Sequence, residues 1–416
     1  IADNLANKNS FEWTVPDQIS DHLRVRVSDL RDSSVSARSA NPFSIIAHFD
    51  VKSPKADDIW IVGSSHEIVW STSGTVPEVA LEFSRDDFYR DINLIANHVP
   101  ITGAAMWTVS DAISPSVKIR VSDMRDSRAA AVSGSFKVRG AIAFVAPETG
   151  SLWKVGSGQK IAWQTLGTIP SVRLEYSRDD FNRDIQVIEN VKENKNGFEW
   201  MVPDVISSTL KLRAADEKDA SVFAVSNPVK VQGILKLKFP GISERVHFKV
   251  LSSQKIAWET TGSISRVRLE YSKDDFNKDI HVLAADLKNQ DSFDWIIPDD
   301  ISDSLKVRVL DAQDFSVFSL SPESFSVRGS LLLTTPTAGV RWPVGSQQGI
   351  TWETIGTIPQ VRVEYSKDDF QKDIHFIAES AANHSKLFWT VPDDISSSVR
   401  LRVVDLEHGE ISSLTA

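Results

Sequence analysis

Short runs in which apolar and polar residues alternate dominate the chain, and one such run recurs four times. Its second copy, at 172–177, reads Val-Arg-Leu-Glu-Tyr-Ser and precedes the polar stretch Arg-Asp-Asp-Phe-Asn-Arg-Asp. The copies begin at Val79, Val172, Val267 and Val361, which gives separations of 93, 95 and 94 residues by subtraction. A fixed period of this length predicts a tandem array of similar domains rather than one large core.

The unit at 140–233 serves as the template for the elements that this pattern predicts. Alternating runs bounded by Gly, Pro and Asp indicate seven short strands, and no stretch has the 3.6-residue period of a long helix. A unit of about 94 residues is large enough for a two-sheet antiparallel sandwich with its own core. The expected strands are 142–145, 160–163, 172–176, 185–188, 198–202, 210–214 and 222–231.

The period divides the chain into five parts whose joints contain hardly any linker. Because flexible arrays carry Gly/Ser-rich or Pro-rich spacers, the short joints predict a semi-rigid rod. Both ends of the sequence fall inside a repeat, so we expect a window on a longer protein. The predicted parts are 1–47, the C-terminal part of a repeat; 48–139, 140–233 and 234–328, whole repeats; and 329–416, a repeat that lacks its last strand.

Composition narrows the classes of function. Lys plus Arg is 46 against 56 for Asp plus Glu, a net charge of −10, which argues against a nucleic-acid partner. The chain has no cysteine, so disulfides and thiolate metal sites are excluded and packing must supply the stability. No apolar run approaches the roughly 20 residues of a membrane helix, so no membrane span is predicted in this segment.

The twelve tryptophans occupy three recurring positions of the repeat. The alternation around them, as in Lys160-Ile-Ala-Trp163, predicts packed strands, so we expect them to fill the core. The alternative is an aromatic platform that stacks on sugar rings, which exposure of one set would favour. The sets are Trp60, Trp153 and Trp342, with Phe248 in the remaining copy; Trp70, Trp163, Trp258 and Trp352; and Trp13, Trp107, Trp200, Trp295 and Trp389.

Outward-facing charges of opposite sign recur on two strands of each repeat. On the strand 172–176, period two directs Val172 and Leu174 inward and Glu175 outward, and the later strand directs Arg213 outward. We expect exposed cross-strand pairs such as Glu175 with Arg213, worth about 0.2–1 kcal/mol each. The recurring positions are Glu82, Glu175, Glu270 and Glu364, and Arg26, Arg120, Arg213, Arg308 and Arg402.

A loop with three aspartates follows the recurring strand in every copy. Oxygen-rich loops suit Ca²⁺, but that ion takes six to eight ligands, and a Lys or Arg lies beside the third Asp of each loop and would neutralise the cluster. Turn formation and capping of backbone N–H groups are the first interpretation, and calcium binding stays open. The trios are Asp86, Asp87 and Asp91; Asp179, Asp180 and Asp184; Asp274, Asp275 and Asp279; and Asp368, Asp369 and Asp373.

No residue stands out from its repeats as a catalytic group. His281 and His375 are matched by Asn93 and Gln186 in the other copies. The sequence has no G-x-S-x-G elbow, H-E-x-x-H pair or Gly-rich phosphate loop. We therefore predict a non-enzyme with no catalytic, cofactor-binding or metal site and no cofactor.

The run Trp342-Pro-Val-Gly-Ser-Gln-Gln-Gly-Ile-Thr-Trp352, followed by a Val-Arg-Val-Glu-Tyr-Ser strand at 361–366, carries a resemblance to a known family. It resembles the immunoglobulin-like repeat of bacterial surface proteins related to the Ser/Thr-rich, GPI-anchored fungal cell-wall (β-glucan assembly) family. Phe248 and Leu251 depart from the W-x-V-G-S motif in one copy, and Ser110 replaces the proline of W-x-V-P in another. The resemblance implies an immunoglobulin-like sandwich, with those local turns in doubt.

The resemblance also implies an extracellular or cell-surface protein, with two possible functions. The first is structural: the repeats form a stalk, a filament or a surface coat, and the partners are neighbouring copies or other surface proteins. The second is an adhesin whose repeats bind a cell-wall polysaccharide or another partner through exposed aromatics. The even period, the short joints and the absence of a copy with distinctive chemistry favour the first.

Overall fold

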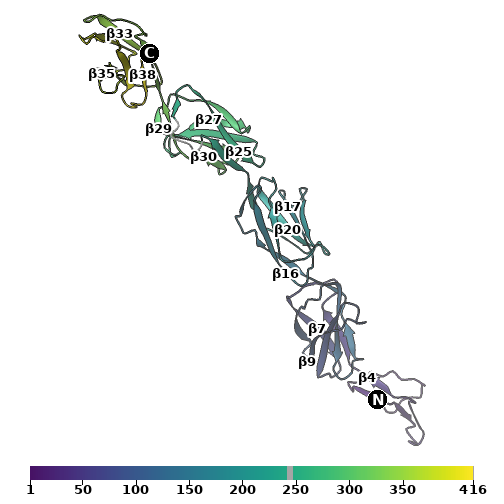
Figure 1. Cartoon of the computed structure of the whole chain (residues 1–416). Coiled ribbons are helices and arrows are strands. Elements are labelled where there is room, and N and C mark those ends of the chain that lie inside the picture. The colour runs from purple at the N-terminus through teal and green to yellow at the C-terminus, as the bar shows by residue number, and fades with distance from the viewer. Residues whose placement is uncertain (241–246, 416) are drawn as a thin grey trace. The chain divides into compact units, whose positions relative to one another are not determined.

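The computed structural model is built from β-strands throughout the residues that it describes, 1–240 and 247–415 (Figure 1). No part of the described chain forms a helix long and apolar enough to cross a membrane. The chain divides into two compact units. Unit 1 comprises Ile1–Ser151, Gly158–Trp200 and Ser208–Lys230, and unit 2 comprises Leu152–Ser157, Met201–Ser207 and Val231–Ala416.

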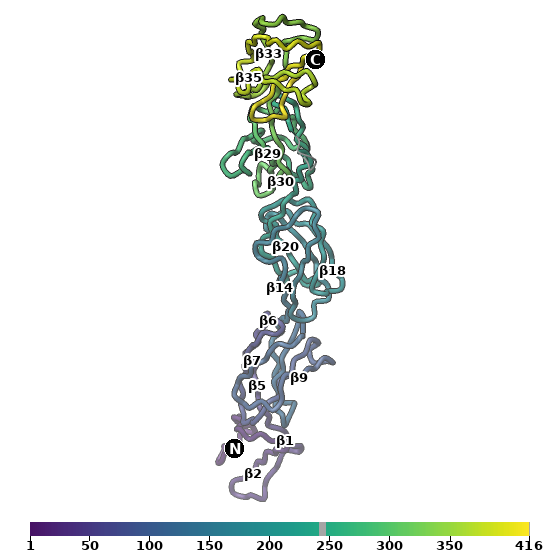
Figure 2. The backbone as a smooth tube through the Cα atoms, turned by 60° about the vertical axis from the view of Figure 1, so that its left-hand side comes forward, coloured from purple at the N-terminus to yellow at the C-terminus, as the bar shows by residue number. Residues whose placement is uncertain are grey.

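Strands β5 to β13 of unit 1 show the architecture of one sandwich. One sheet has the order β10-β7-β5, and the other has the order β6-β13-β11-β8-β9 with β12 beside β11 (Figure 2 traces β5 next to β7). All neighbours are antiparallel except β6 and β13. The strands are β5 (His48–Ser53), β6 (Ile59–Ile61), β7 (Ser65–Ser73), β8 (Glu78–Ser84), β9 (Asn93–Pro100), β10 (Ala104–Thr108), β11 (Ser114–Asp123), β12 (Ala130–Val132) and β13 (Phe136–Arg139).

This strand order defines the fold class. Consecutive strands repeatedly change sheet, as β7 to β8 and β10 to β11 do, so the two sheets enclose one core in the manner of an immunoglobulin domain. The inward positions that alternation predicts fill that core, including Trp70, Val79 and Leu81. The predicted immunoglobulin-like, all-β fold is confirmed.

The rest of unit 1 repeats parts of this pattern. Near the N-terminus β1 pairs with β4 and β2 with β3; farther on, β14 pairs with β16, β17 with both β18 and β20, and β20 with β21. The strands are β1 (Ser20–Leu23), β2 (Arg26–Ser28), β3 (Ser36–Arg38), β4 (Phe43–Ile45), β14 (Ala141–Ala146), β16 (Gly158–Leu166), β17 (Val172–Ser177), β18 (Gln186–Val191), β19 (Gly197–Met201), β20 (Ser207–Asp216) and β21 (Phe223–Val225).

Unit 2 contains two further copies, each with its own buried core. In the first, the sheets are β23-β25-β28 and β24-β31-β29-β26-β27; in the second they are β32-β33-β36 and β35-β34-β37-β38. The strands are β23 (Ile234–Phe239), β24 (His247–Lys249), β25 (Ser253–Thr261), β26 (Arg266–Ser272), β27 (His281–Lys288), β28 (Ser292–Ile296), β29 (Ser302–Asp311), β30 (Phe318–Leu320), β31 (Phe325–Arg328), β32 (Ser330–Thr335), β33 (Gln347–Ile355), β34 (Gln360–Ser366), β35 (His375–Ala382), β36 (Lys386–Thr390), β37 (Arg400–Asp405) and β38 (Ser412–Leu414).

The structure corrects the strand prediction in two places. The expected single strand 222–231 is divided into β21 and β22 (Val229–Gln232), and a short strand, β15 (Leu152–Lys154), was missed. The division occurs because Ser226 takes the place of a backbone partner: its hydroxyl accepts a hydrogen bond from the N–H of Leu212 at 2.9 Å. Pro228, which has no N–H to donate, follows directly.

The turn that Leu251 put in doubt keeps the geometry of the other copies. Leu251 has a φ of +65°, in the left-handed region that favours glycine, and Gly63 and Gly156 at the equivalent position have φ values of +80° and +77°. The substitution therefore leaves the turn in place and adds backbone strain to it.

Candidate functional site

The predicted cross-strand pairs form in all four described copies of the recurring strand. Glu175 lies opposite Arg213 in the register of β17 and β20, and their side chains approach to 2.6 Å. The equivalent pairs are Glu82 with Arg120 (2.6 Å), Glu270 with Arg308 (2.6 Å) and Glu364 with Arg402. The prediction that the two charges share one sheet is confirmed.

The expectation that these pairs are exposed is wrong for three of the four. A second arginine, two residues before the glutamate, also contacts the carboxylate: Arg173, Arg268 and Arg362 lie 2.8, 2.5 and 3.1 Å from it. The glutamate side chains there are only 5, 3 and 1% exposed. Ala80 occupies the equivalent position in the fourth copy, and its glutamate, Glu82, is 22% exposed. The second arginine therefore accompanies burial of the carboxylate.

A phenylalanine from the aspartate loop covers each pair from outside. The Cζ atom of the arginine lies 4.1–4.4 Å from the centre of the ring, close enough for a cation–π interaction. In the template copy, Asp180 and Phe181 both have a φ of +62°, and this left-handed pair bends the loop back over the sheet. The ring–arginine contacts are Phe88 with Arg120, Phe181 with Arg213, Phe276 with Arg308 and Phe370 with Arg402.

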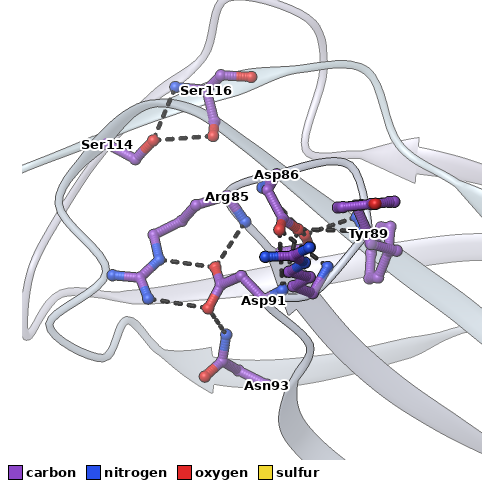
Figure 3. Close-up of polar contacts among 10 residues, drawn as sticks. Arg85, Asp86, Tyr89, Asp91, Asn93, Ser114 and Ser116 are labelled. Carbon is purple, nitrogen blue, oxygen red and sulfur yellow. Dashed lines mark hydrogen bonds and ion pairs between the residues drawn. The ribbon is translucent and has the colours of Figure 1, made fainter.

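The first aspartate of each loop binds backbone N–H groups. Figure 3 shows Asp86, whose carboxylate accepts hydrogen bonds of 2.9–3.1 Å from the N–H groups of residues 89–91. Partial desolvation alone would raise the pKa of Asp86, but hydrogen bonds from the Asp91 N–H and the Ser84 hydroxyl outweigh it and lower that pKa. This geometry supports the interpretation of the loop as a capped turn.

The other two aspartates of the loop bind cations in different directions. Asp91 accepts hydrogen bonds from the Arg85 guanidinium at 2.7 and 2.9 Å, which hold the pKa of Asp91 well below its usual range (Figure 3). Asp87 pairs with Lys118 at 2.9 Å. The neutralising partner of Asp91 is thus the arginine six residues earlier and not the adjacent Arg90, which corrects the prediction.

The three carboxylates do not converge on a common point where a cation could lie. Among the residues that the structure describes, no group of three or more His, Asp or Glu side chains is placed to hold a metal ion. In the first loop each carboxylate instead has partners within the protein, the backbone N–H groups for Asp86, Lys118 for Asp87 and Arg85 for Asp91.

Acid is expected to loosen these loops. The folded-state pKa values of Asp86, Asp179, Asp274 and Asp368 are lowered, so the unfolded chain takes up protons at a higher pH than the folded chain. The contribution to stability is complete above about pH 4, the ordinary aspartate value, and is lost as the pH falls through the lower folded values. Amide hydrogen exchange of the loops at pH 6, 4 and 2.5 should show protection lost below pH 4. Unchanged protection at pH 2.5, relative to amides in the strands, would contradict this expectation.

The tryptophans fill the cores. Trp60, Trp70, Trp107, Trp153, Trp163, Trp200, Trp258, Trp295 and Trp352 are at most 8% exposed. The remaining three, Trp13, Trp342 and Trp389, are half-buried. No set in the described chain is exposed as a whole, so the interpretation as core residues is confirmed and an aromatic platform built from tryptophan is not formed.

His281 and His375, which the sequence analysis examined as candidate catalytic residues, stack on tyrosines. His281 lies parallel to Tyr271 at 4.6 Å and bonds to Asp279 at 2.7 Å, and His375 stacks on Tyr365 in the same way. In the other two copies Asn93 and Gln186 bond to the corresponding aspartates. The four side chains thus share one structural position and its hydrogen bond.

A recurring contact between successive repeats was not predicted. An aspartate directly after the W-x-V-P segment, which reads W-x-V-S in one copy and W-x-I-P in another, accepts hydrogen bonds from a Thr or Ser that follows a Gly of the next repeat. Asp299 accepts from the Thr357 N–H at 2.8 Å and from its hydroxyl at 2.7 Å. The contacts are Asp17 with Thr75, Asp111 with Thr168, Asp204 with Ser263 and Asp299 with Thr357.

Glycine is required beside each of these contacts. Gly356 has a φ of +85°, and a Cβ there would lie 3.0 Å from Val250 and 3.2 Å from Asp299 of the preceding repeat. Gly167 has a φ of +77°, and a Cβ would lie 2.9 Å from Ile113. A side chain there would be strained by the positive φ and would crowd side chains of the preceding repeat, so this glycine allows the close approach.

A second contact crosses three of the joints at the end of the last strand. Arg139 pairs with Asp219 of the next repeat at 2.9 Å, and Arg328 pairs with Glu410 at 2.9 Å. Gln232 takes the equivalent place and donates to Asp314 at 2.8 Å. A single glycine separates the strands on either side, at Gly140, Gly233 and Gly329.

The sequence contained a signal for these joints. The aspartate and its Thr or Ser partner are 58, 57, 59 and 58 residues apart in the four cases, so both recur with the period of the repeat. Neither residue belongs to a strand whose alternation assigns it to a face, and periodicity alone does not show that they meet.

Comparison with known proteins gives structural likenesses only. No family model matches the chain, and no curated protein matches it. Among solved structures it is similar to the tetra-tandem repeat in the extending region of a large adhesion protein, with 12% identity, a TM-score of 0.33, and coverage of 89% of this chain and 98% of that one. It is also similar to the D1–D4 ectodomain fragment of ICAM-5, with 13% identity, a TM-score of 0.31, and coverage of 86% and 94%.

The strand order places the described chain in a class, that of tandem immunoglobulin-like β-sandwich proteins. The structural likenesses above do not assign the chain to a particular family. The resemblance to the fungal cell-wall domain family therefore stays a prediction.

Proposed function

We propose that the chain is a non-catalytic, extracellular structural protein whose repeats form a stalk, filament or surface coat. The observation that carries the proposal is the joint, because the same Asp to Thr or Ser contact recurs between successive repeats at four places. A domain array that served only to tether would not need a repeated contact at every joint. The contacts support a semi-rigid array with the predicted division at 47/48, 139/140, 233/234 and 328/329.

The proposed partners are neighbouring copies of the chain or other surface proteins. The alternative, an adhesin that binds polysaccharide through exposed aromatics, was based on tryptophans that are largely buried in the cores. The structural function therefore has the better support. The cell-surface location belongs to the proposal.

Distances between spin labels across one joint test the proposal. The chain has no native cysteine, so Ala285→Cys and Glu379→Cys place labels at equivalent exposed positions of two successive repeats. We expect a narrow distance distribution that broadens when Asp299→Ala and Thr357→Val remove the joint contact. Each lost hydrogen bond is worth about 0.5–1.5 kcal/mol, so losing both raises the population of open joints by roughly fivefold or more.

The matched control is Asp393→Ala, since Asp393 occupies the same position in the last repeat and makes no joint contact in the described chain. It should leave the distribution unchanged. A broad distribution in the unmodified chain would show free joints and would overturn the proposal.

A further inference from the structure

The outer face of the larger sheet carries the same row of four side chains in every described copy. The row runs across four hydrogen-bonded strands and reads apolar, Glu, Arg, apolar; we call it the outer row. Because neighbouring strands are about 4.8 Å apart, a row spans roughly 14 Å. The rows are Leu94, Glu82, Arg120 and Val132; Val187, Glu175, Arg213 and Val225; Val282, Glu270, Arg308 and Leu320; and Phe376, Glu364, Arg402 and Leu414.

The two ends of each outer row are apolar side chains in contact with solvent. All eight of them are 39–59% exposed, although they point away from the core. The alternation of a half-exposed sheet would place polar residues at such positions. The exception recurs at the same two positions in all four described copies, which distinguishes it from apolar residues scattered singly over a surface.

The Glu–Arg pair at the centre of each outer row is neutral in itself, and in three copies a second arginine beside the row adds one positive charge. The glutamate and the arginine neutralise each other, and a phenylalanine of the aspartate loop covers the arginine. The row itself therefore offers a strongly charged partner no complementary charge. A partner surface matches the row if it also has apolar residues at both ends and a neutral pair in the centre.

We propose that the outer rows mediate face-to-face association with a second copy of this chain. A two-fold axis along the strands, in the plane between two facing sheets, reverses the order of the row. It places the apolar ends of one row on those of the other. It also places each glutamate of the row opposite an arginine of the other row, so that no like charges within the rows face each other. The row is complementary to itself in this arrangement.

The area of one outer row explains why several must act together. Half-exposed apolar side chains contribute about 50–100 Å² each, so one row with its covering phenylalanine offers roughly 150–300 Å². A stable interface takes about 800 Å² from each partner. One row is too small, and association depends on several rows of each chain binding at once.

The periodicity of the rows identifies the partner as a second copy. The outer row recurs at intervals of 93 to 95 residues, and another copy of the chain repeats it at the same intervals by identity. An unrelated partner would have to reproduce that spacing. The inference rests on the proposed structural function and specifies the contact by which its repeats assemble.

Sedimentation velocity of the 416-residue chain over a wide concentration range tests the inference. We expect the weight-average mass to rise above the monomer mass of 46.2 kDa with concentration. The test variant replaces one end of every outer row by lysine and should weaken association at least tenfold. Its substitutions are Leu94→Lys, Val187→Lys, Val282→Lys and Phe376→Lys.

The matched control places four lysines on exposed apolar positions of the smaller sheet, which are 57–66% exposed. It changes the net charge by the same amount and should associate like the unmodified chain. Its substitutions are Met106→Lys, Met201→Lys, Ile296→Lys and Phe388→Lys. Near-ultraviolet circular dichroism checks folding, and lysines at Val132, Val225, Leu320 and Leu414 provide a second test variant.

Two outcomes would overturn the inference. A mass of 46.2 kDa at every concentration would mean that the rows have another occupant. Equal loss of association in the control variant would mean that the contact is not specific to the outer rows. Neither outcome affects the spin-label test, so a chain with stiff joints that stays monomeric would retain the proposed function and lose only this inference.

Discussion

Replacing Glu270 by alanine should destabilise its sandwich by about 3–5 kcal/mol. The carboxylate is 3% exposed and bonds to both Arg268 and Arg308, so its removal leaves two guanidinium groups crowded together without their counter-charge. Breaking a buried ion pair from one side typically costs this much, because the remaining charge has lost most of its water as well as its partner. Phe276, which covers Arg308, prevents that arginine from turning easily toward solvent.

The fourth copy supplies the control for this prediction. Glu82 is 22% exposed and has one arginine, Arg120, because Ala80 stands where the second arginine would be. Glu82→Ala should therefore cost about 1 kcal/mol, the scale of a partly exposed pair. Amide exchange of β26 and β29 in one variant, and of β8 and β11 in the other, reports each cost in the whole chain. If the two substitutions cost the same stability, burial of the carboxylate by the second arginine does not strengthen the ion pair.

Alternation and period predicted most of the fold, but they did not predict how the loops cover the outer face of the sheet. The pattern of Val172, Leu174 and Glu175 was sufficient to place core and surface and to pair Glu175 with Arg213. It did not show that Phe181 folds back over the arginine, because that depends on two successive left-handed residues in the loop. Strand periodicity contains no information on loop backbone angles.

The sequence predicted that the joints are short, but it did not predict the hydrogen bonds that hold them. The single residue between β31 and β32, Gly329, is visible in the sequence as a missing linker. The bond from Thr357 to Asp299 joins two turns of different domains, and a single sequence gives no means of pairing them. Contacts between domains depend on the relative placement of two finished folds, which local patterns do not determine.

Replacing Asn289 by isoleucine should cost at least about 1–3 kcal/mol, although the position lies in a turn. The amide oxygen of Asn289 accepts a hydrogen bond from the indole N–H of Trp258 at 2.9 Å, and its amide nitrogen donates to the Ile264 carbonyl at 2.8 Å. Trp258 is 3% exposed, so without Asn289 its N–H has no access to water and loses its partner. A buried donor left without an acceptor costs about that amount.

The chain itself contains the comparison variant. Trp163 and Trp352 have the same asparagine partner, but the equivalent residue in the first complete sandwich is Ile101, and the Trp70 indole N–H has no partner among the described residues. Ile101→Asn should supply that acceptor and protect the Trp70 N–H from exchange, a gain that the lost packing of Ile101 partly offsets. Indole N–H exchange measured by NMR distinguishes the two changes, and equal exchange of Trp70 and Trp258 in the unmodified chain would contradict both.

Asn289 also connects the core to the joint at Gly233, so its replacement should affect the joint as well. Ile264, whose carbonyl Asn289 holds, packs against Gly233, where a Cβ would lie 2.7 Å from the isoleucine side chain. Gly233 is the single residue between β22 and β23, and Ser263, next to Ile264, bonds to Asp204 of the preceding repeat. Asn289→Ile should therefore speed amide exchange at 262–264 as well as in the core. A change confined to the core would mean that the joint is held by its own contacts alone.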